Sequence, residues 1–91
     1  MIALFIYFHQ TYMYFVYLLQ SLNDSRYYIG QTNNIEERLK YHNRGKCKYT
    51  KNKGPWILIG YKTFPTRAEA MREEKKLKSF RNRTAIRKYF T

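Results

Sequence analysis

The sequence predicts a small layered α/β domain, in which helices flank a three-stranded, mostly antiparallel sheet in the order ββαβαα. Three short segments are rich in aromatic and β-branched residues, as strands are. Segments between and after them place apolar residues at helical spacing. With 91 residues the chain can form one domain with a single modest core, so the helices are expected to pack on one sheet.

The first two expected strands form a hairpin. Residues 14–20 are an aromatic and β-branched run, and residues 27–31 are a second one. Residues 22–25, between them, have the composition of a turn. A connection this short joins antiparallel neighbours, so the two strands are expected to pair directly.

A helix is expected next. Asn33 or Asn34 can cap its start. Ile35 and Leu39 follow helical spacing and would anchor the helix to the core, and Gly45 is a natural stop. The helix is therefore expected to begin after this cap and to stop at Gly45.

The second half supplies one strand and two helices. Residues 46–53 form a loop with four lysines, and residues 56–64 are the third apolar and aromatic run. Thr66 can cap a long helix over residues 67–80. Residues 82–90 are expected to form a short final helix.

The first twelve residues differ from the rest. Residues 2–8 are apolar, but the run is far shorter than a membrane span and no positive charge precedes it as in a signal peptide. We expect residues 1–12 to be an extension that the domain, residues 13–91, does not need. An added edge strand, packing on the sheet and self-association remain alternatives for the extension.

The charge is strongly positive and unevenly placed. Lys and Arg total 18 against 6 acids, for a formal net charge of +12, and residues 1–25 contain neither Lys nor Arg. This balance predicts a polyanionic partner, most simply nucleic acid; an anionic membrane and a merely solubilising surface are the alternatives. The basic residues expected to contact nucleic acid lie in the lysine loop and near the end of the chain: Lys46, Lys48, Lys51, Lys53, Arg81, Arg83, Arg87 and Lys88.

The sequence contains a single cysteine, which limits the disulfides and metal sites that the chain could form. Because Cys47 is alone, an intrachain disulfide and a cysteine-rich metal cage are both excluded. Its polar surroundings hold no acid–base partner nearby in sequence, so we interpret it as incidental rather than nucleophilic. A reducing cytoplasm is the expected location.

Four residues of the first half could form a reactive site. Strand alternation directs Tyr17 to one face, and Tyr28 lies on the second strand beside Gly30, which suggests a close approach by a ligand or another backbone. Arg38 and His42 are four residues apart on the expected helix and project from one face. Taken singly, each residue is most simply a packing or surface residue.

Glu74 is an acidic residue in the most basic part of the chain. It falls between Ala70, Met71 and Leu77 on the side of its helix that is expected to face the core. A carboxylate there is costly unless a cation or hydrogen bonds compensate it. The compensating cation is a Lys, an Arg or a metal ion.

The order of these residues resembles the GIY-YIG nuclease superfamily, above all its small stand-alone bacterial members, which are similar to the nuclease module of excision repair. Phe15 stands where the family name has glycine, and Gln31 where several members carry lysine. The motifs that carry the resemblance are Phe15-Val16-Tyr17-Leu18, Tyr28-Ile29-Gly30, Arg38-Leu39-Lys40-Tyr41-His42-Asn43, Tyr49-Thr50, Pro55-Trp56, Glu69-Ala70 and Glu74-Lys75-Lys76-Leu77-Lys78.

The resemblance implies a role for each candidate. Glu74 would be the protein carboxylate on a divalent ion, Mg²⁺ or Mn²⁺, and Arg38 would hold the phosphate. Tyr17 would take a proton from the attacking water with help from His42, and Tyr28 would position the water or phosphate. The reverse assignment, with Tyr28 as the base, is also consistent with the sequence.

The implied activity is metal-dependent endonuclease cleavage of phosphodiester bonds, most simply in DNA during repair or recombination, with low sequence specificity. Two alternatives remain from the sequence. One is a nucleic-acid-binding domain that has lost catalysis. The other is a small interaction protein in which the same residues serve packing and salt bridges.

Overall fold

The computed structural model describes residues 13–91, so the expectation for residues 1–12 lies outside the described part of the chain. Three strands, β1 (Tyr14–Ser21), β2 (Tyr27–Thr32) and β3 (Trp56–Phe64), form one sheet in the order β2-β1-β3. Both pairings are antiparallel, and β1 is the central strand. The expected hairpin and three-stranded antiparallel sheet are confirmed.

Three helices complete the predicted order: α2 (Ile35–Asn43), α3 (Arg67–Lys78) and α4 (Arg83–Phe90). None of these helices is long and apolar enough to cross a membrane. α3 ends two residues before the expected Phe80, because Ser79 caps it through Lys76 O. The residues whose side chains cap the three helix starts are Asn34, Thr66 and Asn82.

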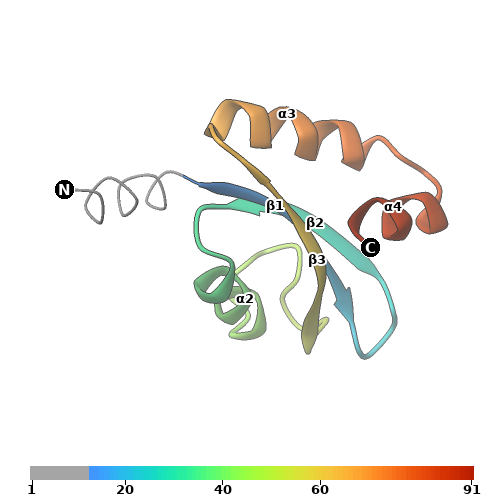
Figure 1. Ribbon diagram of the computed structural model, residues 1–91. Coiled ribbons are helices and arrows are strands. Elements are labelled where there is room, and N and C mark those ends of the chain that lie inside the picture. The colour runs from blue at the N-terminus through green and yellow to red at the C-terminus, as the bar shows by residue number, and fades with distance from the viewer. Residues whose placement is uncertain (1–12) are drawn as a thin grey trace.

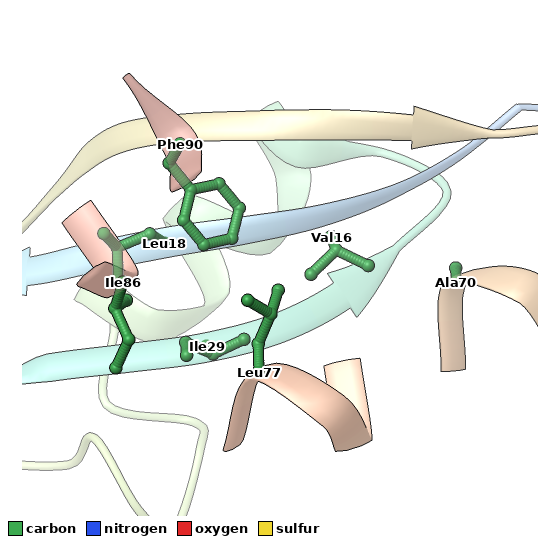
Figure 2. Close-up of a cluster of buried hydrophobic side chains, with 7 residues drawn as sticks. All are labelled: Val16, Leu18, Ile29, Ala70, Leu77, Ile86 and Phe90. Atoms are coloured by element: carbon green, nitrogen blue, oxygen red, sulfur yellow. The ribbon is translucent and has the colours of Figure 1, made fainter. Parts of the chain in front are cut away.

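One face of the sheet carries the main hydrophobic core and is covered by α3 and α4 (Figure 1). Side chains from β1 and β2 meet side chains from both helices there (Figure 2). Strand alternation directs every second residue of β1 to this face, which leaves the residues between them for the opposite face. The buried cluster comprises Val16, Leu18, Ile29, Ala70, Leu77, Ile86 and Phe90.

The opposite face is covered by α2 and by the segment that connects α2 to β3 (Figure 1). Tyr17, Leu19 and Trp56 are buried here, with Tyr28 and Leu39 packed against them. Two tyrosines and a tryptophan are prominent on this face, whereas the buried members of the other core are aliphatic apart from Phe90. This aromatic face therefore carries hydroxyl groups close to the packed interior, and it holds most of the candidate site.

We predict that a truncated chain beginning at Met13 folds and keeps the activity of the full chain. Residues 13–91 already form the three-stranded sheet, the helices α2, α3 and α4, and both hydrophobic clusters. Thermal melting and a nucleic-acid cleavage assay on the truncated chain check this. Unfolding of the truncated chain at temperatures where the full chain is folded would instead make residues 1–12 part of the domain.

Candidate active site

Gly30 allows the Tyr17 side chain to cross the neighbouring strand. Tyr17 on β1 pairs with Gly30 on β2, so both residues point to the α2 face. A Cβ atom at position 30 would collide with the Tyr17 hydroxyl oxygen and its ring. Any other residue there would displace the ring. The close approach expected at this glycine is thus made by a side chain of the protein itself.

The Tyr17 hydroxyl reaches a buried hydrogen-bonded chain. Its oxygen lies 2.8 Å from His42 Nε2, and His42 Nδ1 lies 2.8 Å from Thr50 Oγ1. His42 and Thr50 are both fully buried, and the Trp56 indole donates to the Thr50 carbonyl oxygen. The imidazole is therefore held at both nitrogens. Sequence reasoning missed Thr50 as a site residue, although the Tyr49-Thr50 motif was a signal for it.

Burial and the charge of Arg38 determine the protonation states of Tyr17 and His42. Burial raises the pKa of Tyr17 to about 12, although the nearby Arg38 guanidinium lowers it. Burial, and then the charge of Arg38, lowers the pKa of His42 to about 4. At neutral pH the imidazole is neutral, with one nitrogen donating and the other accepting. It can therefore accept a hydrogen bond from the Tyr17 hydroxyl.

Arg38 carries an unsatisfied donor at the edge of the cluster. Its guanidinium lies 4.3 Å from the centre of the Tyr41 ring, and Nε is buried without a hydrogen-bond partner among the described residues. A buried donor of this kind is costly unless something accepts from it. An anion such as a phosphate suits it. The adjacent cleft of about 210 Å³ is lined by Thr32, Asn33, Asn34, Glu37, Arg38 and Tyr41.

Tyr28 lies beside the same imidazole. Its ring centre is 4.8 Å from that of His42 and 6.4 Å from that of Tyr17. Burial, followed by the nearby Tyr17, raises the pKa of Tyr28. Tyr28 is the less buried of the two tyrosines. The structure thus brings Tyr17, Tyr28, Arg38 and His42 together, as the sequence predicts.

Glu74 lies at the edge of this cluster, on a helix that packs on the other face of the sheet. It lies on α3, but Lys78 Nζ, 2.7 Å from Glu74 Oε2, is also 5.7 Å from the centre of the Tyr28 ring. The charge of Glu74 contributes, as a minor cause, to the raised pKa of Tyr17. Because β2 is an edge strand, α3 side chains can reach around it. Glu74 therefore stands at the β2 edge of the cluster rather than across the sheet from it.

The surroundings of Glu74 correct one expectation. Ala70 and Leu77 are buried, but Met71 is 52% exposed, so the core-facing stripe of α3 is narrower than predicted. Glu74 borders this stripe with a side chain that is 20% exposed. Lys78 supplies the compensating cation. The expectation of a cation beside Glu74 holds, with a lysine in that place.

The donor set fits a divalent ion that relies on few protein ligands. Within residues 13–91, no three His, Cys, Asp or Glu side chains are grouped to hold a metal. Mg²⁺ prefers oxygen ligands, keeps several waters and often takes one or two carboxylates plus substrate phosphate. The half-buried Glu74 carboxylate meets that requirement. A metal at Glu74 would replace the Lys78 ammonium.

The predicted nucleic-acid-binding residues fall into two groups on opposite faces of the sheet (Figure 1). The loop lysines lie in the segment that connects α2 to β3, which also holds the Thr50 that contacts His42. Arg83 and Arg87 belong to α4. Arg83 packs 3.9 Å from the Tyr27 ring centre and donates to a backbone carbonyl, which accounts for its position structurally. The exposed members are Lys46, Lys48, Lys51, Arg81, Arg83, Arg87 and Lys88, whereas Lys53 is half-buried.

We predict that the free energy of unfolding falls as pH is lowered from 6.5 towards 4. His42 has a folded pKa of about 4, below its usual 6.5, so the unfolded chain takes up the proton first and acid favours unfolding. The loss is at most about 3 kcal/mol. Urea denaturation at several pH values checks this. His42→Asn should flatten the pH dependence above pH ~4.5, and equal slopes for both chains would contradict it.

Residues 13–89 match the family described as the GIY-YIG catalytic domain, and the chain belongs to that family. The family is one of nucleases, which act on nucleic acid. The family resemblance found in the sequence is confirmed.

Its relatives are small bacterial proteins named UPF0213. The chain is 48% identical over 67 residues to one from Nitratidesulfovibrio vulgaris, covering 72% of this chain but only 60% of that protein. It is 42% identical over 66 residues to one from Oceanobacillus iheyensis, covering 71% of this chain and 76% of the relative. The solution NMR structure of a UPF0213 protein from Bacillus halodurans is similar, with a TM-score of 0.50 and 36% identity over 80% of this chain and 78% of the other.

Proposed function

We propose that this protein is a metal-dependent endonuclease that hydrolyses phosphodiester bonds, most simply in DNA, with low sequence specificity. The observation that carries the proposal is the buried contact between Tyr17 Oη and His42 Nε2, placed beside an arginine with an unsatisfied donor. In a family of nucleases, this contact supplies a proton path and the arginine supplies an anion site.

Substrate binding begins at Arg38. A guanidinium is planar and permanently charged, so it can hold two phosphate oxygens at once. Its buried Nε would gain the acceptor that the described residues do not provide. A phosphate bound there would also offset the positive charge of Arg38, which depresses the pKa of His42. Burial would then be the remaining cause of that low pKa. Phosphate binding therefore makes His42 a better proton acceptor.

Proton transfer then runs along the hydrogen-bonded chain. Tyr17 accepts a proton from the attacking water as its own hydroxyl proton passes to His42 Nε2, so a free phenolate with its unfavourable pKa need not form. This direction requires that His42 Nδ1–H donates to Thr50 Oγ1. Thr50 thus fixes the tautomer of the imidazole. Tyr28, packed against the same ring, would orient the water or the phosphate.

Glu74 is the residue that would hold the divalent ion. When bound, such an ion neutralises charge on the phosphate and assists departure of the leaving oxygen. Glu74 lies at the β2 edge. When no ion is bound, the Lys78 ammonium neutralises its carboxylate. The ion held by Glu74 and the Arg38 guanidinium would therefore both supply positive charge to the phosphate.

A nucleic-acid-binding domain with lapsed catalysis is the second candidate. Two observations favour it: the Glu74–Lys78 ion pair already satisfies the carboxylate, and burial leaves Tyr17 with a pKa of about 12. Such a domain would bind through its basic residues with strong salt dependence but would not cut.

Incubation with labelled DNA and RNA forms, in Mg²⁺, Mn²⁺ or EDTA, separates the two candidates. We expect cleavage that requires the metal, and binding in EDTA that weakens steeply with salt, because basic side chains displace counterions from phosphates. Salt-dependent binding without cleavage would favour the second candidate. Binding that does not change with salt would contradict both and favour an interaction protein.

A further inference from the structure

The lysine loop, residues 46–53, is fixed to the protein at several points. Cys47 and Thr50 are buried, and the Thr50 and Lys51 backbone N–H groups donate to the Cys47 carbonyl oxygen. The Ser21 hydroxyl donates to the Lys53 carbonyl oxygen at 2.6 Å. The Thr50 side chain is the one that holds His42. The loop is therefore a rigid turn attached directly to the proposed catalytic histidine.

This rigid turn presents an aromatic ring to solvent. Tyr49 is 71% exposed, the highest exposure among the large hydrophobic side chains of the described residues. Lys48 and Lys51 are exposed on the same turn, and the Lys53 ammonium donates to the Tyr49 carbonyl oxygen. The turn thus combines an open aromatic face with positive charge, one residue away from Thr50.

An exposed aromatic ring among lysines is the arrangement that binds unpaired nucleobases. Bases stack on the ring whatever their identity, while the positive side chains follow the phosphate backbone. In a paired duplex the base faces are covered by their neighbours, so only an unpaired or displaced base offers a face to Tyr49. Lysines alone would bind the phosphate backbone of paired and unpaired nucleic acid equally well.

We infer that Tyr49 stacks on an unpaired nucleobase close to the cleaved phosphate, so that the preferred substrate class is nucleic acid with a single-stranded stretch, such as a gap or a flap, rather than a fully paired duplex. The inference rests on the proposed nuclease function. Its consequence is selectivity for structure without selectivity for sequence, because every base has a face that can stack.

Equilibrium binding in EDTA, where metal-dependent cleavage is suppressed, tests this. Two probes of identical sequence are compared, a gapped duplex with a fluorescent base analogue in the gap and a fully paired duplex. The variants are Tyr49→Phe, which keeps the ring, and Tyr49→Leu, which keeps an apolar side chain without a ring. We expect Tyr49→Leu to weaken gapped-duplex binding about tenfold and to abolish quenching of the analogue, while Tyr49→Phe behaves as wild type.

The outcomes separate this inference from the function on which it rests. If Tyr49→Leu leaves gapped-duplex binding unchanged, or weakens both probes equally, base stacking by Tyr49 is overturned, while nuclease function stands if the wild-type chain binds and cuts. If the wild-type chain binds neither probe, the proposed function itself fails and the inference fails with it. Because Tyr49 is exposed, the variants are expected to fold, and thermal melting confirms that they do.

Discussion

Tyr17→Phe should reduce cleavage by roughly 10²- to 10⁴-fold, the range that a positioned acid–base group contributes. The substitution keeps the ring that passes over Gly30 and removes only the hydroxyl bonded to His42. Nucleic-acid binding should remain, because Arg38 and the loop lysines are untouched. Single-turnover cleavage with saturating metal, together with binding in EDTA, measures the two effects separately.

This experiment needs one control variant and one condition on temperature. Tyr61→Phe removes the hydroxyl of an exposed tyrosine on β3 and should cut at the wild-type rate. Tyr17→Phe also leaves His42 Nε2 without its partner, at a stability cost of about 1–3 kcal/mol, so cleavage must be measured well below the melting temperature. If Tyr17→Phe cleaves as fast as wild type, Tyr17 is not the general base. Tyr28 would then be assigned that role, and Tyr28→Phe should reduce cleavage instead.

Much of the fold was predictable because local signals agree with the tertiary structure. The aromatic and β-branched runs became the three strands, and the short turn after β1 fixed the antiparallel pairing. Asn34, Thr66 and Asn82 cap helices close to where sequence spacing placed them. The end of α3 was less predictable, because the Ser79 hydroxyl competes with the helix by donating to the Lys76 carbonyl oxygen.

The site was predictable in its members but not in its geometry. The i, i+4 spacing that put Arg38 and His42 on one helix face is a local rule, whereas only the family resemblance put Tyr17 and Tyr28 with them; both tyrosines do lie beside His42. The His42–Thr50 contact joins a helix to a loop, and local periodicity does not encode it. The exposure of Met71 likewise depends on how α3 sits on the sheet.

Glu74→Gln should reduce Mg²⁺-dependent cleavage by at least about a hundredfold while the domain stays folded. The substitution keeps the shape of the side chain and removes the negative charge that would hold the ion. It also removes the ion pair with Lys78, which is partly exposed and contributes little to stability. Cleavage measured over a range of Mg²⁺ concentrations, with melting as the test of folding, provides the measurement.

Glu36 provides a matched control on α2. It forms an i, i+4 ion pair with Lys40 at 3.6 Å and is more exposed than Glu74. Glu36→Gln therefore removes a comparable helix ion pair far in sequence from α3 and should leave cleavage unchanged. If Glu74→Gln also cuts as wild type, Glu74 holds no metal, and Glu73 and Glu69 become the carboxylates to test.

Lys78→Met distinguishes a metal ligand from a structural ion pair. If Glu74 matters only because it pairs with Lys78, removing either partner should damage the protein alike. If Glu74 holds the ion, Lys78 competes with the metal for the same carboxylate. Lys78→Met should then retain cleavage and reach half-maximal rate at a lower Mg²⁺ concentration than wild type, whereas a loss as large as that of Glu74→Gln would assign the carboxylate a structural role.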